Sequence, residues 1–258
     1  MIRKLKFLIY ALLFCCSFQP GSLSLAWAGE INAAVASNFY NPFREVAKQF
    51  EKETGHKVRI ISGSTGKLYA QIVHGAPFEL FLAADSKRPT LLEKKGNAVA
   101  KSRFTYALGK IALWSPNPNW ISKDGTSTLR TSAFGYLAMA NPKTAPYGKA
   151  ALQTLQKLSL WEKVRPRVVQ GENIGQTFQF VASQNAELGF VALSQILDPK
   201  NKIKGKKWDV PVSFYDPLKQ DVVILEKGKN NPGAKALWEF LKSDQAKLII
   251  KKYGYGLP

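Results

Sequence analysis

Short hydrophobic runs alternate with longer stretches of helical spacing along most of this chain. Ile31, Ala33 and Val35 lie two positions apart, and the apolar residues of segment 43–50 then recur three and four positions apart. These are the periods of a strand and of the buried face of a helix. The same succession returns up to about residue 193. Strands that alternate with helices are typical of mostly parallel sheets covered on both faces, so the pattern predicts an α/β protein.

Glycine and proline mark the ends of several of these expected elements. Pro42 stands at the start of the first helix-like stretch, and Gly55 and Gly75 follow the first and the second. Helices favour proline in the first turn and glycine just past the end. The expected strands are 31–35, 58–61, 78–84, 136–140, 168–169 and 188–193, and the expected helices are 42–54, 68–75, 89–95, 151–158, 176–183 and 234–241.

Two longer runs, Phe104–Ser115 and Val212–Leu225, break the regular alternation. Both are mostly apolar and lack helical spacing, so we expect extended chain that passes from one lobe to another and back. A second lobe would then be inserted in the first. The expected division is a leader at 1–28, lobe 1 at 29–109 with 217–258, and lobe 2 at 110–216.

Four uncharged tripeptides stand where an expected strand gives way to an expected helix. A helix start leaves several backbone N–H donors unpaired and carries about half a positive elementary charge. One such start is a common turn, whereas several that converge on one point would bind a small anion. In parallel sheets, ligands collect at the carboxyl ends of the strands, where all four tripeptides fall. They are Ser37-Asn38-Phe39, Ser64-Thr65-Gly66, Pro146-Tyr147-Gly148 and Asn173-Ile174-Gly175.

The first 28 residues have the organisation of a secretory signal peptide. A basic start at Arg3, Lys4 and Lys6 precedes the apolar run Phe7–Phe18, and Ala26-Trp27-Ala28 is a small-x-small cleavage site. A membrane anchor would need about 20 apolar residues. We therefore expect cleavage near Ala28 and an exported, periplasmic protein.

Both cysteines, Cys15 and Cys16, lie inside this leader, so we expect no disulfide, no thiol nucleophile and no cysteine-bound metal in the exported chain. A lipoprotein site at Cys15 is disfavoured because Phe14 is bulky where a small residue is needed. After loss of the three basic residues of the leader, 34 Lys and Arg face 18 Asp and Glu, a formal charge of +16. Such a charge attracts anions over long range. A nucleic-acid partner is not expected for an exported protein.

Several short sequences of this chain are similar to those of the molybdate-binding proteins of molybdate ABC transporters. Each is weak alone, but they occur in a common order over about residues 31–258, essentially the whole exported chain. They include Ala34-Val35-Ala36-Ser37-Asn38-Phe39, Ser62-Gly63-Ser64-Thr65-Gly66, Tyr69-Ala70-Gln71-Ile72-Val73, Gly75-Ala76-Pro77, Ala83-Ala84-Asp85, Asn141-Pro142, Ala145-Pro146-Tyr147-Gly148, Asn173-Ile174-Gly175-Gln176 and Leu188-Gly189-Phe190-Val191-Ala192-Leu193.

This resemblance implies the type II fold of periplasmic binding proteins and a role as the extracytoplasmic component of an importer. The partners would be a transmembrane permease and its cytoplasmic ATPase, the ligand molybdate or tungstate, and the protein a monomer without cofactor or catalytic activity. The oxyanion would be held without a free metal cation. Carried over residue by residue, the resemblance assigns its binding to Ser37, Asn38, Ser64, Thr65 and the backbone N–H groups of Tyr147 and Ile174.

One position departs from part of the family, because Ala192 stands where some members place a tyrosine that donates to the ligand. That contact is absent here unless Tyr147 compensates. Lys67 and Lys149 directly follow two of the turns, and we expect them to steer the anion without touching it. The hinge is expected near Leu108–Ile111 and near Tyr215–Leu218.

Other interpretations remain to be weighed against the structure. Ser37 and Thr65 could be simple helix caps, and Asp85 is expected to cap the following helix. The same fold could bind sulfate, which has the right charge but is smaller. A hydrolase is less favoured, since His56 and His74 are expected on different elements and no Gly-x-Ser-x-Gly motif occurs. A ferric carrier would need clustered tyrosines or carboxylates, and Tyr253 and Tyr255 lie in the C-terminal segment.

Overall fold

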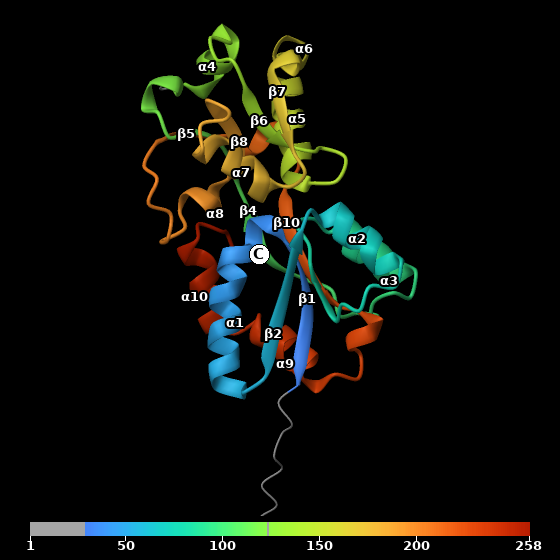
Figure 1. Ribbon diagram of the computed structural model, residues 1–258. Helices are drawn as coiled ribbons and strands as arrows, with labels where there is room; N and C mark the ends of the chain where they lie inside the picture. The colour runs from blue at the N-terminus through green and yellow to red at the C-terminus, as the bar shows by residue number, and fades with distance from the viewer. Residues whose placement is uncertain (1–28, 123) are drawn as a thin grey trace, which may run out of the picture.

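The computed structural model describes residues 29–122 and 124–258. The predicted signal peptide therefore lies outside the described residues. Two five-stranded sheets form two lobes, each with helices on both faces, which confirms the predicted two-lobed α/β fold (Figure 1). Both sheets are more mixed than expected, because each combines two parallel with two antiparallel strand pairings.

The lobe 1 sheet has the strand order β2-β1-β3-β10-β4. Strand β1 pairs in parallel with both β2 and β3, whereas β10 is antiparallel to both β3 and β4. The strands of this sheet are β1 (Glu30–Ala36), β2 (Lys57–Gly63), β3 (Leu80–Leu82), β4 (Phe104–Gly109) and β10 (Leu218–Ile224).

The lobe 2 sheet has the order β7-β6-β8-β5-β9, which is the same arrangement made from later strands. Here β6 pairs in parallel with β7 and β8, and β5 is antiparallel to β8 and β9. All five strands come from one continuous stretch of chain, so this lobe is inserted between β4 and β10. They are β5 (Ile111–Ser115), β6 (Leu137–Ala140), β7 (Val168–Gly171), β8 (Leu188–Ala192) and β9 (Lys206–Asp209).

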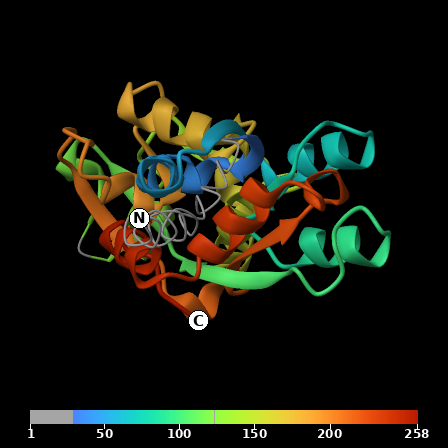
Figure 2. The same cartoon turned by 90° about the horizontal axis from the view of Figure 1, so that it is seen from below.

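Helices cover both faces of each sheet and bury separate hydrophobic clusters (Figure 1). In the view of Figure 2, α2 and α3 lie well apart from α1 and from the C-terminal helices. The α-helices are α1 (Tyr40–Thr54), α2 (Thr65–Val73), α3 (Lys87–Lys94), α4 (Gly125–Thr131), α5 (Pro146–Lys157), α6 (Trp161–Val164), α7 (Ile174–Ala182), α8 (Leu193–Ile196), α9 (Pro232–Phe240) and α10 (Asp244–Lys252). The 3-10 helices are η1 (Ser37–Phe39), η2 (Pro118–Trp120), η3 (Arg165–Arg167), η4 (Val212–Phe214) and η5 (Glu226–Gly228).

The local sequence explains why α1 has the expected position. Phe43, Val46 and Phe50 are fully buried against the sheet, as their helical spacing predicts. Gly55 follows the helix with φ of 75° and donates its N–H to the carbonyl of Glu51. This left-handed conformation suits glycine, which therefore ends α1 where the sequence predicted.

Both predicted crossing runs differ in detail from a single extended stretch. Phe104–Ser115 is split at Lys110 into β4 and β5, which belong to different sheets. Val212–Leu225 begins with the 3-10 helix η4 and becomes extended at β10. The hydrophobic pattern could not show these breaks, because buried strands and short buried turns share the same composition. The exact lobe boundaries at Gly109 and Pro217 stay predictions.

None of the helices in the described part of the chain is long and apolar enough to cross a lipid bilayer.

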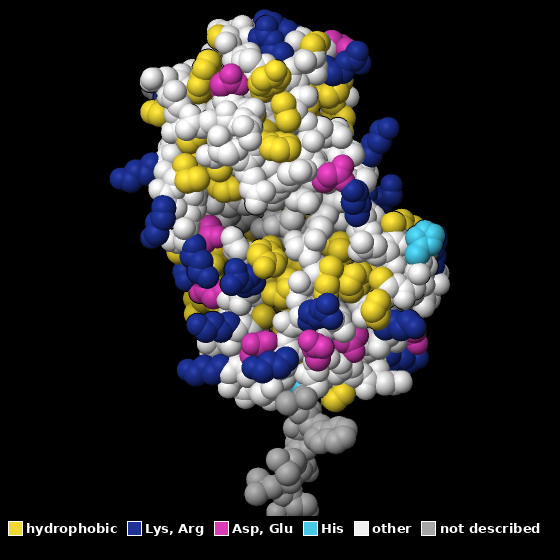
Figure 3. Space-filling model, viewed as in Figure 1, with side chains coloured by type: hydrophobic (Ala, Val, Ile, Leu, Met, Phe, Trp, Pro, Cys, Tyr) yellow, Lys and Arg dark blue, Asp and Glu magenta, His cyan; other side chains and the backbone are white. Residues whose placement is uncertain are grey.

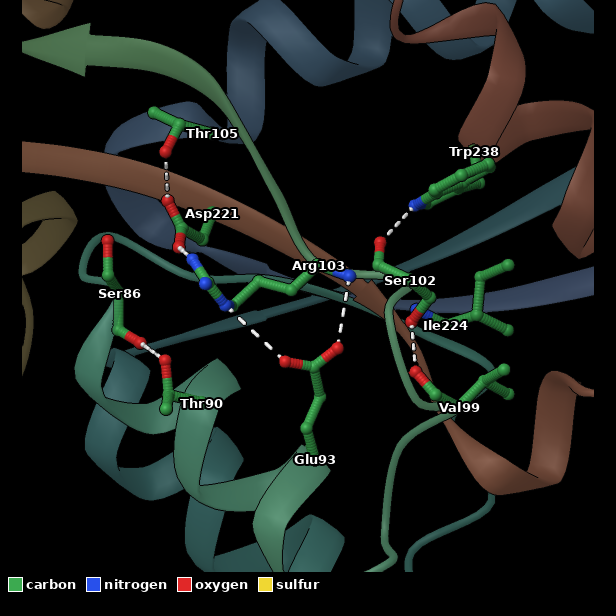
Figure 4. A network of polar contacts seen from close by, with 10 residues as sticks. All are labelled: Ser86, Thr90, Glu93, Val99, Ser102, Arg103, Thr105, Asp221, Ile224 and Trp238. Carbon is green, nitrogen blue, oxygen red and sulfur yellow. Dashed lines mark hydrogen bonds and ion pairs between the residues drawn. The ribbon is translucent and has the colours of Figure 1, made fainter.

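The fold is stabilised within lobe 1 by a polar network that joins α3, β4, β10 and α9 (Figure 4). Its centre is Asp221, a fully buried carboxylate on β10. Arg103 Nη1 lies 2.7 Å from one carboxylate oxygen, and Thr105 Oγ1 donates to the other at 2.7 Å.

The rest of this network attaches α3 and α9 to the same strands. Glu93 on α3 accepts from the backbone N–H of Arg103 and forms an ion pair with its side chain. Ser102 accepts from the N–H of Ile224 through its hydroxyl, and its carbonyl accepts from the indole of Trp238 at 2.6 Å. These contacts fix β10, the strand that returns from lobe 2, to the body of lobe 1.

We predict that Arg103→Ala lowers the free energy of unfolding by about 1–3 kcal/mol, because it removes a charged partner from the buried carboxylate of Asp221. The control is Arg165→Ala, which breaks an exposed ion pair with Glu162 and should cost less than about 1 kcal/mol. Urea unfolding of both variants measures the difference. Equal stability of the two variants would show that the Asp221 network does not stabilise lobe 1.

Candidate functional site

The four turns predicted from the sequence lie at the carboxyl ends of four parallel strands, two in each lobe. β1 and β2 lead into η1 and α2, while β6 and β7 lead into α5 and α7. β1 and β2 are neighbours in one sheet, and β6 and β7 are neighbours in the other. Two pairs of helix starts therefore meet between the lobes.

These turns enclose one small cavity. All six residues predicted to bind an anion line it, and its volume of about 10 Å³ is close to the minimum for one water molecule. No charged side chain belongs to the lining formed by the described residues. The structure is thus a closed form in which groups from both lobes converge on one uncharged point. The lining residues are Ala36, Ser37, Asn38, Gly63, Ser64, Thr65, Ala84, Ala145, Pro146, Tyr147 and Ile174.

The first turn is held by the side chain of Asn38. Its amide nitrogen donates to Gln220 Oε1 at 2.7 Å and to Tyr255 Oη at 2.9 Å, so both amide hydrogens are used inside lobe 1. Ser37 Oγ lies across the lobe boundary from α7 and accepts from the N–H of Gly175 at 3.4 Å. We therefore expect Asn38 to contribute a backbone N–H and Ser37 its hydroxyl.

Three supporting residues were not found by sequence reasoning. Tyr255 Oη donates to the carbonyl of Asn38 at 2.9 Å, and it lies 3.0 Å from Ser194 Oγ. Ser194 on α8 also donates to the Asn38 carbonyl at 3.1 Å, which ties lobe 2 to the first turn. Burial raises the pKa of Tyr255 to about 12, so its hydroxyl keeps its proton at neutral pH. No sequence signal pointed to Gln220, Ser194 or Tyr255 as supports, because each lies outside the four turns and far along the chain from Asn38.

The second turn contains a buried hydroxyl without a partner. Ser64 is 3% exposed, and its Oγ makes no hydrogen bond to any described residue. Thr65 Oγ1 accepts from the N–H of Ala84 at 3.1 Å, which leaves the hydroxyl hydrogen free to donate. Neither η1 nor α2 is capped by a side chain, so the alternative of Ser37 and Thr65 as simple helix caps is not supported.

The third and fourth turns supply backbone donors. The first hydrogen bonds of α5 and α7 run from Lys149 and Thr177, and Asn173 Oδ1 accepts from the N–H groups of Gly175 and Gln176. Within the described chain, the N–H groups of Tyr147 and Ile174 make no hydrogen bond. These two donors remain at the cavity, as expected for the first turn of a helix.

The phenol of Tyr147 does not take the place of the tyrosine that Ala192 replaces. A Cβ atom added at Gly109 would lie 2.2 Å from Tyr147 Oη, so this hydroxyl packs against the last residue of β4. Ala192 itself is buried at the start of α8 and does not line the cavity. The backbone N–H is therefore the donor that we expect from Tyr147.

Direct contacts between the lobes hold the closed form. The N–H of Gly66 donates to the carbonyl of Thr144 at 2.8 Å, and Arg88 donates to the carbonyl of Lys143 at 3.2 Å. Lys67 on α2 forms an ion pair with Glu172 beside the fourth turn. Lys67 is therefore part of the lobe contact and does not line the cavity, in agreement with its predicted lack of ligand contact.

A second, larger cavity of about 520 Å³ adjoins the first and shares Ala84, Ala145 and Pro146 with it. Five basic residues line it, and Lys149 among them pairs with Asp216 at 2.7 Å. The hydrogen bond from Lys149 lowers the pKa of Asp216. Lys and Arg side chains are also spread over both lobes on the face shown in Figure 3. The five are Lys87, Arg88, Lys143, Lys149 and Lys219.

Residues considered for other chemistry lie elsewhere. His56 accepts from the N–H of Gly29 and stacks on Phe50, whereas His74 is exposed after α2. Asp85 accepts from the N–H of Arg88 at the start of α3, as expected of a cap. The described residues contain no cluster of three His, Cys, Asp or Glu side chains that could hold a metal ion.

Two α/β lobes that enclose a small cavity lined by helix starts define a solute-binding protein. The family of bacterial extracellular solute-binding proteins matches residues 31–256, and the chain belongs to that family. Molybdate-binding protein ModA of Azotobacter vinelandii is 53% identical over 232 residues, which cover 90% of this chain and 92% of the relative. ModA of Rhodobacter capsulatus is 46% identical over 230 residues, 89% of either chain.

The fold agrees with these relatives. The solved structure of the periplasmic molybdate-binding protein of Azotobacter vinelandii matches with a TM-score of 0.85 and 41% identity, and the match covers 88% of this chain and 99% of that chain. The chain thus belongs to the same family as these two ModA proteins.

We predict that Gly66→Ala holds the lobes apart. An added Cβ would lie 2.9 Å from the backbone of Thr144 in the other lobe, and overpacking of this kind costs about 1–3 kcal/mol. In small-angle scattering, the Gly66→Ala variant should have a larger radius of gyration than the parent protein has. The control is Gly29→Ala, where an added Cβ meets nothing closer than 3.9 Å. An unchanged radius for Gly66→Ala, with a normal unfolding curve, would contradict this role.

Proposed function

We propose that this protein captures molybdate or tungstate between its lobes. The observation that carries the proposal is the convergence of four uncharged turns, two from each lobe, on one cavity. The cavity presents the buried Ser64 hydroxyl and the free N–H groups of Tyr147 and Ile174. Helix starts of this kind favour an anion. The relatives at 53% and 46% identity are named molybdate-binding proteins, which supports the choice of oxyanion.

The chemistry of the lining supports a fully ionised dianion. Every group that we expect at the cavity is a donor, and no Asp or Glu of the described chain belongs to the lining. Hydrogen phosphate carries a proton that would find no carboxylate to accept it there, and a proton left without an acceptor costs about 1–3 kcal/mol. Sulfate has the same charge as molybdate, so only the size of the cavity can decide whether sulfate is the ligand instead. We propose that donors spaced for the larger molybdate hold sulfate less tightly.

We propose that capture and closure are one equilibrium. The first two turns belong to lobe 1 and the other two to lobe 2, so one small anion can contact all four only in the closed form. A ligand that binds one form better shifts the population toward it. The angle between the lobes would change at the two segments that cross between them, Leu108–Ile111 and Tyr215–Leu218, where few backbone torsions have to change.

We place the protein in the periplasm, exported by the leader at 1–28. Its proposed role is to deliver the anion to a permease with a cytoplasmic ATPase, in line with the membership of the solute-binding family. The oxyanion is cargo, so no cofactor, free metal cation or catalytic step is required. We propose that the protein works as a monomer, because both halves of the site come from one chain.

Isothermal titration with molybdate, tungstate, sulfate and phosphate tests the proposed ligand. Molybdate and tungstate should bind tightly with one site per chain, and sulfate and phosphate at least about a hundredfold more weakly. The proposed donors are serine and threonine hydroxyls and backbone N–H groups, which do not titrate near neutral pH, and burial raises the pKa of Tyr255, which holds Asn38, to about 12. Molybdate affinity should therefore stay constant between about pH 6 and pH 9. Sulfate affinity comparable to that for molybdate would reject the proposal.

The Ser64 hydroxyl provides a test of the site itself. Ser64→Ala should weaken molybdate binding by about 1.5–3 kcal/mol, the range for hydrogen bonds to charged groups. Stability without ligand should not fall, because Ser64 Oγ has no partner within the described chain.

The matched control for this test is Ser243→Ala. Ser243 caps α10 by accepting from the N–H of Ala246 at 3.2 Å, so its loss should cost about 0.5–2 kcal/mol of stability. Molybdate affinity should be unchanged in this variant. If Ser64→Ala lost stability and kept its affinity, Ser64 would be a structural residue only.

A further inference from the structure

Gln195, on the short helix α8, holds a residue of the fourth turn through its side-chain amide. Its Nε2 donates to the carbonyl of Ile174 at 3.0 Å, and its Oε1 accepts from the N–H of Ala192 at 3.0 Å. These two bonds fix the orientation of the amide, because a flipped amide would set two donors and two acceptors against each other. Gln195 does not line the small cavity, so its hydrogen bonds reach the site through Ile174.

The bond from Gln195 joins the starts of two helices that follow different strands. α7 begins at the carboxyl end of β7 and α8 at that of β8, and β6 lies between these strands in the sheet of lobe 2. The backbone of α8 is itself held in place. The N–H of Leu193 donates to the carbonyl of Lys110 at 2.9 Å, and Asn201 Nδ2 donates to the carbonyl of Gln195 at 3.3 Å. Gln195 therefore holds Ile174 from a fixed position.

The two backbone groups of Ile174 have different tasks. Its N–H remains at the cavity without a partner in the described chain. Asn173 Oδ1 caps α7 by accepting from the next two N–H groups, those of Gly175 and Gln176. The first residue of a helix has few helical hydrogen bonds, and helix ends fray. The bond from Gln195 to the Ile174 carbonyl therefore restrains the residue whose N–H is available to a ligand.

The residue before Gln195 has a similar role at the first turn. Ser194 Oγ donates to the carbonyl of Asn38 at 3.1 Å, so consecutive residues of α8 hold one carbonyl in each lobe. Separation of the lobes would affect the two bonds differently. Ser194 reaches across to lobe 1, whereas Gln195, Ala192 and Ile174 all belong to lobe 2. The bond from Gln195 can therefore persist when the lobes are apart.

We infer that Gln195 is a positioning residue of the anion site, which orients the N–H of Ile174 toward the cavity before the lobes close. This inference rests on the proposed capture of an oxyanion between the lobes. A donor that is already oriented loses less conformational freedom on binding, so more of its hydrogen bond contributes to affinity. Gln195 thereby strengthens binding without contacting the ligand.

Gln195→Met tests the inference, because methionine is unbranched and of similar length but lacks the amide. Molybdate affinity in isothermal titration should fall by roughly two- to tenfold, the equivalent of one neutral hydrogen bond. A purely structural role would not change one backbone donor selectively. In amide NMR spectra, the shift caused by molybdate should therefore be smaller than in the parent at Ile174 and unchanged at Tyr147, the donor of the third turn.

The control is Gln49→Met, which removes another glutamine amide that donates a hydrogen bond. Gln49 Nε2 donates to Glu53 Oε1 at 2.7 Å, and both residues lie on α1 in lobe 1. Because this bond stays within one helix and involves none of the four turns, molybdate affinity should remain within about twofold of the parent. The amide signals of Ile174 and Tyr147 should respond to molybdate as they do in the parent.

Two kinds of failure can be told apart. If the parent binds neither molybdate nor tungstate, the proposed function fails, and spectra without ligand then decide the role of Gln195. Gln195→Met must shift the amide signals of Ile174 and Gly175, and Gln49→Met must leave them in place. Unchanged signals at these two residues in folded Gln195→Met would overturn the inference.

If the parent binds, the inference is also overturned when Gln195→Met keeps the parental affinity or the parental response of the Ile174 amide. Thermal unfolding without ligand shows whether each variant is folded. If Gln195→Met does not fold, Gln195→Glu replaces it at neutral pH with the same expectation at the Ile174 amide. The introduced carboxylate keeps an acceptor for the N–H of Ala192 and has no donor for the Ile174 carbonyl.

Discussion

Unpaired N–H groups at helix starts are the constraint around which the two lobes are organised. α5 and α7 each begin with a donor that nothing in the described chain accepts, at Tyr147 and Ile174. Water can satisfy these donors while the lobes are apart. Closure removes that water, so the closed form needs an acceptor in its place. The fold therefore brings four helix starts together at a point where the N–H groups of Tyr147 and Ile174 have no partner in the described chain.

The sequence was sufficient for the elements and for the turns between them, because both depend on local patterns. Strand and helix periodicity gave the α/β class, and residue types at the expected helix starts gave the four turns. The family resemblance then selected six residues within these turns, all of which line the cavity. Periodicity did not show the 3-10 helix at Val212–Phe214 or the division of 104–115 into two strands, although the expected lobe boundary lies at the same place, between residues 109 and 110. Both are set by the return of the chain between two sheets, a long-range constraint that leaves no local signal.

The residues that hold the first turn show more clearly that long-range contacts leave no local signal in the sequence. The family resemblance predicted Asn38 as a ligand residue, but both of its amide hydrogens are used in hydrogen bonds to Gln220 and Tyr255. These partners lie about 180 and 220 positions later in the chain. A residue type can indicate that a hydrogen bond will form, but the partner depends on topology. The residues that line the cavity were therefore accessible to sequence reasoning, whereas the residues that fix their orientation were not.

The insertion of lobe 2 has a consequence for how the chain matures. The strands of lobe 2 form one unbroken segment, whereas the lobe 1 sheet needs β10, which is made last. A polypeptide that emerges N-terminus first can complete lobe 2 while lobe 1 still exposes the edges of β3 and β4, where β10 will pair. Domains generally fold as units during such emergence. Lobe 1 is thus the part whose sheet is completed last, and Tyr255, which supports the first turn through the Asn38 carbonyl, is among the last residues to emerge.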